Sequence, residues 1–264
     1  MVPIDAFVDA FHDACFEGNL SETQKALASG RLSTEDLDEA LNLASGEAHP
    51  DIVAALFDAG ARVTANSVSF LTGKDGQQHP SIARCYLNHG LDPNSNVSNG
   101  EPLLRFMRNT ACVHALLSRG ADPNRCGPKG GTPLACALEY VCEDTSLFGL
   151  LVEYGAKLES NLLFEAIRPR GEGIFKTRFL LSKGLDPNTT SAEWGTPLHR
   201  AAYLAKEEVV KLLLEAGADS TARANCRQFK NQSLSEVAGE RLQRDPDLQA
   251  PLQTILKLLG SYQG

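Results

Sequence analysis

The chain has 264 residues, of which 42% are hydrophobic and 22% charged, and its formal net charge at pH 7 is −8. An acidic balance of this size disfavours nonspecific binding to nucleic acid or to an anionic membrane surface. No run approaches the roughly eighteen apolar residues of a membrane span, and the first apolar segment is broken by aspartates, so neither a span nor a signal peptide is expected.

The acidic charge is concentrated at the N-terminal end. Residues 1–60 carry twelve acidic side chains against Lys25 and Arg31, a net charge of −10, which leaves +2 for the rest of the chain. The seven cysteines are scattered, odd in number and without a Cys-x-x-Cys pair. Such a set is not typical of a secreted disulfide framework, so we expect reduced thiols and a cytoplasmic or nuclear protein.

Glycine recurs after leucine-rich helical segments at a nearly constant spacing. The positions are Gly30, Gly60, Gly90, Gly120, Gly155, Gly184 and Gly217, which gives spacings of 30, 30, 30, 35, 29 and 33 residues. Glycine tolerates the positive φ that a residue just after a helix often needs. The spacing therefore predicts one helical unit repeated along the chain, each copy ending at one of these glycines.

The whole chain, residues 1–264, is predicted to form a single domain of about seven repeats and a partial capping repeat. In chain order the predicted repeats are 4–30, 32–60, 66–90, 99–120, 130–155, 160–184 and 194–217, followed by the partial repeat 232–260. Repeat three is the poorest, because glycines and polar residues at 73–79 interrupt its inter-helix turn. Lower local stability is expected there. Asp-Pro-Asn at 92–94, 122–124 and 186–188 follows a repeat glycine each time and predicts a fixed turn.

Repeat seven is the clearest copy. It begins Gly195-Thr196-Pro197-Leu198-His199-Arg200-Ala201-Ala202. Thr196 is predicted to cap its first helix, and Pro197 suits the first helical turn. Its second helix is predicted from the apolar residues Val209, Val210, Leu212, Leu213 and Leu214. This sequence resembles an ankyrin repeat, whose signature is Thr-Pro-Leu-His-x-Ala within a period of about 33 residues.

The resemblance extends over essentially the whole chain. It implies an all-α solenoid of stacked helix-turn-helix repeats joined by short β-hairpin loops. It also implies that the buried histidine of the signature bonds to backbone of the neighbouring repeat, and both His199 and His12 occupy that position. Ankyrin repeat proteins usually bind on their concave side, which is lined by the hairpin tips and the exposed face of each first helix. We therefore expect a non-catalytic scaffold that binds a protein or peptide there.

Projecting repeat seven onto the other repeats gives the candidate contacts. The predicted partner-binding residues are Trp194, Tyr203, Arg200, Arg105, Arg108, Tyr140, Glu165 and Arg168, with further hairpin-tip positions at Asn99, Lys129 and Glu193. Tryptophan and arginine are enriched at binding hot spots, and Trp194 is the only tryptophan. The alternative for each residue is ordinary solvated surface, and for Trp194 it is packing against the adjacent hairpin.

The charge of these positions is mixed. Glutamates at 139, 165 and 193 interrupt the arginines, so the unbroken positive track that nucleic acid needs is missing. We therefore expect a monomer that binds an acidic or mixed-charge protein or peptide, and neither nucleic acid nor a membrane.

Two other functions are left open by the sequence. One is a small-molecule-binding protein or unusual enzyme that uses the concave groove. The other is a substrate of asparagine hydroxylation at Asn94, Asn124 or Asn188, because related ankyrin domains are modified at this turn position, although each asparagine here follows proline. The histidines do not pair with cysteine or carboxylate at metal-ligand spacing, and no catalytic set is legible, so no metal, cofactor or catalytic residue is predicted.

Overall fold

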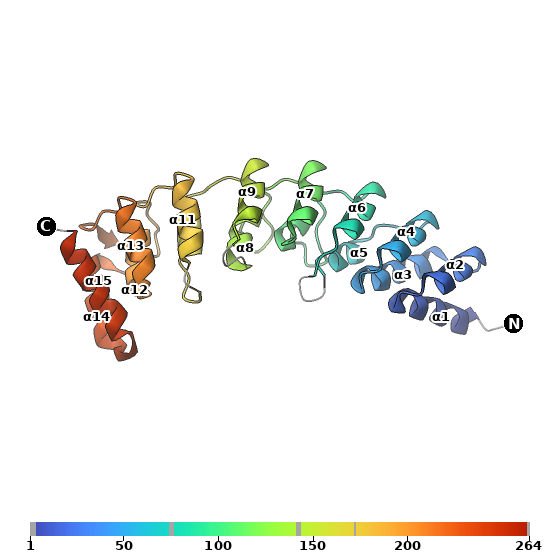
Figure 1. Cartoon of the computed structure of the whole chain (residues 1–264), viewed down its shortest axis with the longest axis horizontal. Helices are drawn as coiled ribbons and strands as arrows, with labels where there is room; N and C mark the ends of the chain where they lie inside the picture. Colours follow the sequence, from blue (N-terminus) through green and yellow to red (C-terminus); the bar gives the residue numbers. More distant parts are fainter. Residues whose placement is uncertain (1–3, 74–76, 141–143, 172, 263–264) are drawn as a thin grey trace. The chain divides into compact units, whose positions relative to one another are not determined.

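The structure is a computed structural model that describes residues 4–73, 77–140, 144–171 and 173–262, except the side chain of Tyr140 (Figure 1). The chain divides into two compact units. Unit 1 comprises residues 1–137 and 146–156, and unit 2 comprises residues 138–145 and 157–264. Helix α8 (Pro133–Tyr140) begins in unit 1 and ends in unit 2.

Both units are built from short helices joined by turns. Unit 1 contains α1 (Ile4–Glu17), α2 (Leu20–Ala28), α3 (Thr34–Gly46), α4 (Pro50–Asp58), α5 (Ala65–Phe70), α6 (Pro80–Asn88), the 3-10 helix η2 (Leu103–Phe106), α7 (Thr110–Ser118) and α9 (Ser146–Glu153). Unit 2 contains α10 (Leu162–Ala166), α11 (Ile174–Ser182), α12 (Pro197–Tyr203), α13 (Glu207–Glu215), β1 (Arg223–Asn225), β2 (Lys230–Ser233), α14 (Leu234–Arg244), η3 (Pro246–Leu248) and α15 (Gln249–Ser261).

The helices stack by type within each unit (Figure 1). In unit 1, α1 packs on α3 and α3 on α5, while α2 packs on α4 and α4 on α6. In unit 2, α12 packs against α10 and α14, while α13 packs against α11 and α15. First helices therefore contact first helices and second helices contact second helices, which confirms the predicted fold of stacked helix-turn-helix repeats.

The repeat glycines end the second helices, as the spacing predicts. All seven have positive φ, between 64° and 104°. At Gly217 the chain leaves α13 with φ 90°, and the N–H of Ala218 donates to the carbonyl oxygen of Leu213 at 2.9 Å. That bond satisfies one of the last carbonyl groups of the helix. A Cβ at Gly217 would meet no atom within 4 Å, so the backbone conformation, and not crowding, selects glycine here.

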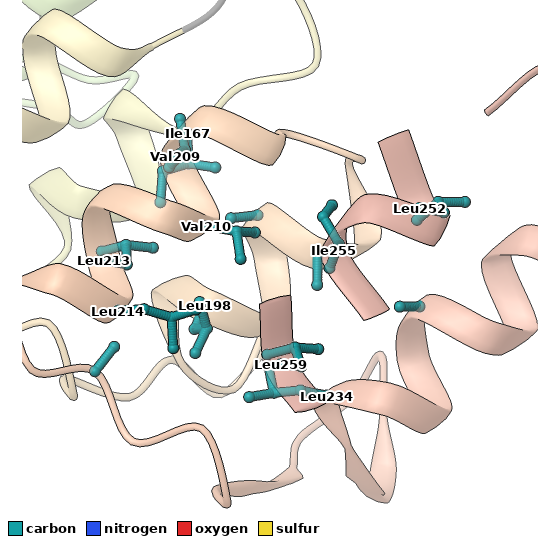
Figure 2. Packing of buried hydrophobic residues seen from close by; sticks show 14 residues of the cluster. Ile167, Leu198, Val209, Val210, Leu213, Leu214, Leu234, Leu252, Ile255 and Leu259 are labelled. Atoms are coloured by element: carbon teal, nitrogen blue, oxygen red, sulfur yellow. The ribbon is translucent and has the colours of Figure 1, made fainter. Parts of the chain in front are cut away.

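The core of unit 2 lies between its stacked pairs. Figure 2 shows leucine, isoleucine and valine side chains of α12, α13, α14 and α15 pointing toward one another. Leu213 is fully buried in this cluster, as expected for the apolar side of the second helix, whereas its neighbour Leu212 is half-buried. Burial of such side chains contributes about 1.5–3 kcal/mol each, so packing between repeats dominates the stability of these short helices.

Repeat three departs from the regular pattern. Its first helix, α5, is only six residues long, and residues 74–76 of the interrupted turn lie outside the described residues. Gln78 is buried, and its amide group bonds to the carbonyl oxygens of Thr72 and Phe106 at 3.2 and 2.9 Å. Its side-chain oxygen accepts from the N–H groups of Arg108 and Asn109 at 2.8 and 3.0 Å. One glutamine thus joins this turn to repeat four by polar contacts.

The Asp-Pro-Asn sequences form the fixed turns predicted for them. In each turn the aspartate oxygen accepts from the asparagine N–H, for example Asp186 from Asn188 at 2.8 Å. The asparagine side chain then bridges to the next repeat: Asn188 Nδ2 donates to the carbonyl oxygen of Gly217 at 3.0 Å, and Asn188 Oδ1 accepts from the N–H of Asp219 at 2.7 Å. Asn94 bridges in the same way to Gly120 and Asp122. These asparagines therefore tie successive turns together.

Candidate functional site

The hairpin that carries Trp194 is closed by a two-way backbone pairing of Ser191 with Gly195. The loop between β1 and β2 lies against it, since the N–H groups of Arg227 and Gln228 donate to the carbonyl oxygens of Ala192 and Glu193 at 2.9 and 3.1 Å. Gly195 has φ 71°, and a Cβ there would lie 2.6 Å from the Cβ of Ala224. The two hairpins can approach this closely only because residue 195 is glycine.

Trp194 packs partly against this neighbouring hairpin. Its ring lies 6.3 Å from the ring of Phe229 and 5.7 Å from that of Tyr203, centroid to centroid. Trp194 is nevertheless only half-buried. One part of the Trp194 side chain therefore packs against the adjacent hairpin, and the other part faces solvent.

Helix α12 begins at Pro197 and presents Arg200 and Tyr203 three residues apart, on one face. Thr196 caps the helix, and its Oγ1 lies 2.8 Å from Nδ1 of the buried His199. Burial lowers the pKa of His199, against the opposing effect of the backbone carbonyl groups of Gln232 and Ala222. The imidazole ring stacks on the ring of Phe229, with 6.2 Å between their centroids. In unit 1, His12 Nε2 lies 3.1 Å from the carbonyl oxygen of Asp36 in the next repeat.

Two arginines flank the aromatic rings. The guanidinium carbon of Arg200 lies 4.9 Å from the centre of the Trp194 ring, and that of Arg241 lies 5.0 Å from the centre of the Tyr203 ring. Both are cation–π distances. Arg241 also pairs with Asp245 at 3.0 Å. Burial lowers the pKa of Arg200, and the charges of Glu165 and Glu193 oppose that effect. An arginine stays charged under such conditions, so the face carries two fixed positive groups.

Further charged side chains lie on the preceding repeats of unit 2. Arg168 contacts Glu139 at 3.3 Å and forms a close ion pair with Glu165. The side chains of these three residues are 36–47% exposed. Ion pairs this exposed contribute at most about 1 kcal/mol to stability, so their groups can exchange partners at little cost. The charges of Glu165 and Arg168 also act on Arg200. We use the name charged-aromatic row for the set that these contacts and charge interactions connect: Glu139, Glu165, Arg168, Trp194, Arg200, Tyr203 and Arg241.

The structure thus brings five predicted contact residues into the row and places two, Arg105 and Arg108, elsewhere. Tyr203, Trp194, Arg200, Glu165 and Arg168 lie in unit 2. Arg105 and Arg108 lie in unit 1, and the side chain of Tyr140 lies outside the described residues. Arg108 is exposed, and its backbone N–H is held by Gln78.

Arg105 is more enclosed than the sequence predicts, because its side chain is 16% exposed. Its guanidinium pairs closely with Glu101, whose side chain is only 1% exposed, and its Nε donates to Cys136 Sγ at 2.9 Å. Glu101 also accepts from the N–H of Lys129, at 2.8 Å. Burial opposes ionisation of Glu101, but the Lys129 N–H and the guanidinium outweigh it and hold its pKa below the ordinary value. Glu101 therefore joins two hairpins, and Arg105 links Glu101 to Cys136 of α8.

Phe229 and Arg241 were not predicted from the sequence. They belong to the β1–β2 hairpin and α14, where the repeat pattern is weakest and projection from repeat seven gives no register. The basic composition of 223–232 was the one available signal. Over the part of the chain that the structure describes, no cluster of three or more histidine, cysteine, aspartate or glutamate residues could hold a metal ion. None of the described helices is long and apolar enough to cross a membrane.

Comparison with known proteins finds repeat domains. Residues 174–214 match the family model "Ankyrin repeats (many copies)". The chain is 34% identical over 97 residues to the 2-5A-dependent ribonuclease of Mus musculus, which is 36% of this chain and 11% of that protein. It is 30% identical over 131 residues to Ankyrin repeat and SOCS box protein 11 of Danio rerio, or 48% of this chain and 42% of that protein. The chain thus spans less than half the length of these relatives.

One solved structure is similar over almost its whole length. The crystal structure of the human ASB11 ankyrin repeat domain superposes with a TM-score of 0.54 and covers 93% of this chain and 96% of that chain, at 19% identity. At this identity, the similarity establishes a shared fold.

Proposed function

We propose that this chain, which has the ankyrin repeat fold and carries ankyrin repeats at 174–214, is a non-catalytic module that binds a protein or peptide through the charged-aromatic row of unit 2. The fold confirms the resemblance drawn from the sequence. Ankyrin repeat domains typically bind proteins, and the fold is generally a non-catalytic interaction module. The binding face and the partner class are the proposed part.

The observation that carries the proposal is the alternation of guanidinium groups and aromatic rings. Arg200 lies over Trp194, Trp194 contacts Tyr203, and Arg241 lies over Tyr203. Large rings and arginines are the side chains that most often dominate binding energy. Because each one is already held by its neighbour, less side-chain entropy is lost when a partner binds. A half-buried tryptophan that is fixed in this way is a preorganised contact.

The charges of the row favour an acidic or mixed-charge peptide. Arg168, Arg200 and Arg241 each present a planar guanidinium that can hold a carboxylate through two parallel hydrogen bonds. Glu139 and Glu165 alternate with them and would pair with basic residues of the same partner. A partner whose charges alternate in the opposite sense would satisfy both kinds of group.

The proposal is tested by affinity capture with a matched pair of variants, followed by mass spectrometry. Trp194→Ala removes the central ring of the row. Phe175→Ala is the control, because Phe175 is a 47% exposed aromatic residue of α11 in the same unit, outside the row. Proteins captured by the wild type and by Phe175→Ala should be lost with Trp194→Ala, with an affinity loss of about 2 kcal/mol or more, as for a typical hot spot. Undiminished capture by Trp194→Ala would reject the row as the binding face.

A further inference from the structure

A pocket of about 240 Å³ adjoins the charged-aromatic row within unit 2. It lies between α12, the β1–β2 hairpin and α14. We call it the basic pocket, because its walls include Arg227, Lys230, Arg241 and Arg244, and the rings of Tyr203 and Phe229 contribute to its lining. Pockets that take a whole small molecule are typically about 300–1,000 Å³, so this one is of a size for a single side chain.

The positive charge of the basic pocket is only partly neutralised. Arg244 pairs with Glu240 at 3.4 Å, and Arg241 pairs with Asp245 at 3.0 Å. Within the described parts of the chain, neither Arg227 nor Lys230 has a carboxylate partner, and both are exposed. Four cationic groups therefore stand against two carboxylates, which leaves an excess of two positive charges.

The lining strengthens the effect of this charge. Phe229 and Val237 are buried, and they contribute apolar surface to the lining of the pocket. Charges beside such a surface interact more strongly than charges surrounded by water. Arg241 is held against the Tyr203 ring and by Asp245, so its guanidinium is fixed before any ligand arrives. The amide of Gln228 adds a neutral donor to the walls, while the amide of Gln232 donates to Glu240.

We propose that the basic pocket binds the phosphoryl group of a phosphorylated side chain in a peptide that lies along the charged-aromatic row, an inference that rests on the proposed function. A phosphoryl group carries about −1.5 to −2 charges at pH 7 and three strong acceptor oxygens. It therefore matches an excess of two positive charges and several donors converging from a hairpin and a helix. A carboxylate would neutralise only half of that excess. Tyr203 belongs both to the row and to the pocket lining, so one peptide can reach the two.

The test compares two fluorescein-labelled pools of eleven-residue peptides with degenerate flanking positions. One pool has a central phosphoserine, phosphothreonine or phosphotyrosine, and the other has the same residues unphosphorylated. Binding is followed by fluorescence anisotropy. The wild type should bind the phosphorylated pool at least tenfold more tightly. This preference should decline below about pH 6, where the phosphoryl dianion takes up a proton and becomes a monoanion.

Three variants assign the preference to the pocket. The double variant Arg227→Ala/Lys230→Ala should lose it, because it removes the two unpaired cations. Lys211→Ala/Lys257→Ala is the control of equal charge, since both lysines are exposed and lie on α13 and α15. It should keep the preference. Glu240→Gln should increase it, because one negative charge leaves the wall of the pocket.

The outcomes separate this inference from the proposed function. Trp194→Ala should weaken binding of both pools and leave their ratio unchanged. Equal affinity of the wild type for the two pools would overturn the phosphoryl pocket, and so would an equal loss of the preference in both double variants. In either case, weaker binding by Trp194→Ala would still support the binding row. A preference that depends on Arg227 and Lys230, together with undiminished binding of both pools by Trp194→Ala, would support the pocket and contradict the row.

Discussion

Repeat four in unit 1 and repeat seven in unit 2 place an arginine at the same repeat position and use it differently. Arg105 follows Pro102 by three residues, as Arg200 follows Pro197. Both side chains are half-buried, but Arg105 pairs with Glu101 and Cys136, whereas Arg200 lies over the ring of Trp194. The repeat position therefore fixes the backbone and leaves the role of the side chain to its neighbours.

The residue before the proline makes the difference. In repeat seven it is Thr196, whose hydroxyl caps α12 and carries no charge. In repeat four it is Glu101, which lies four residues before Arg105 and draws the guanidinium inward. The first helix of repeat four is also only the 3-10 turn η2. Polar contacts thus replace part of the helix-on-helix packing there.

The largest effect on stability is expected in repeat seven, whose helices pack through apolar side chains. Leu213→Ala should lower the free energy of unfolding by about 2–5 kcal/mol, because it leaves a cavity between stacked second helices. Leu212→Ala, in the same helix but half-buried, should cost less. Chemical denaturation of the two variants measures both values. An unchanged midpoint for Leu213→Ala would show that the helix is assigned the wrong register.

The next largest effect is a difference in stability and in binding between the Arg105 and Arg200 variants. Arg105→Ala should lower the melting temperature by several degrees, because it leaves the Glu101 carboxylate enclosed without its cation. Arg200→Ala should lower it less and should weaken partner binding more. Thermal unfolding and affinity capture of the same two variants give both comparisons. A larger stability loss for Arg200→Ala would reverse the roles assigned to them.

Substitution of the turn glycine should cost the same stability in repeat four and in repeat seven, because the two turns share one backbone conformation. Gly120 and Gly217 have φ of 92° and 90°, and a Cβ would meet nothing within 4 Å at either. Gly120→Ala and Gly217→Ala should therefore each cost about 1–2 kcal/mol, from backbone strain alone. Gly217→Val should cost more, because a β-branched residue tolerates positive φ least. Denaturation curves test this, and a marked difference between the two alanine variants would contradict a common turn.

The smallest effect is a pH dependence specific to repeat seven. Because burial lowers the pKa of His199 in the folded state, the unfolded chain binds this proton more readily. The contribution is fully present above about pH 6.5, the ordinary pKa of histidine, and is lost as the pH falls toward the lower folded value. Melting temperatures between pH 7 and pH 5 should therefore fall less for His199→Gln than for the wild type. Parallel curves would assign the dependence to other groups.

The periodic part of the fold was predictable from the sequence, because each repeat glycine marks a helix end with positive φ. The positions of Arg200 and Tyr203 in the row were predictable, because both lie on α12, whose register follows from the repeat pattern. Projection did not predict the pairing of Arg105 with Glu101, although a glutamate four residues before an arginine is itself a signal of an ion pair. Phe229 and Arg241 were missed because Phe229 reaches Trp194 through the pairing of two hairpins, and Arg241 reaches Tyr203 through packing of α14 on α12, which no local pattern encodes.

The central claim is that a partner binds the charged-aromatic row and not the acidic N-terminal repeats. The direct measurement is amide hydrogen exchange of the protein alone and in complex with the partner captured by the wild type. Binding on the row predicts slower exchange in the complex at 191–204 and 223–245, with no change at 4–60. Slower exchange confined to 4–60 would contradict the claim.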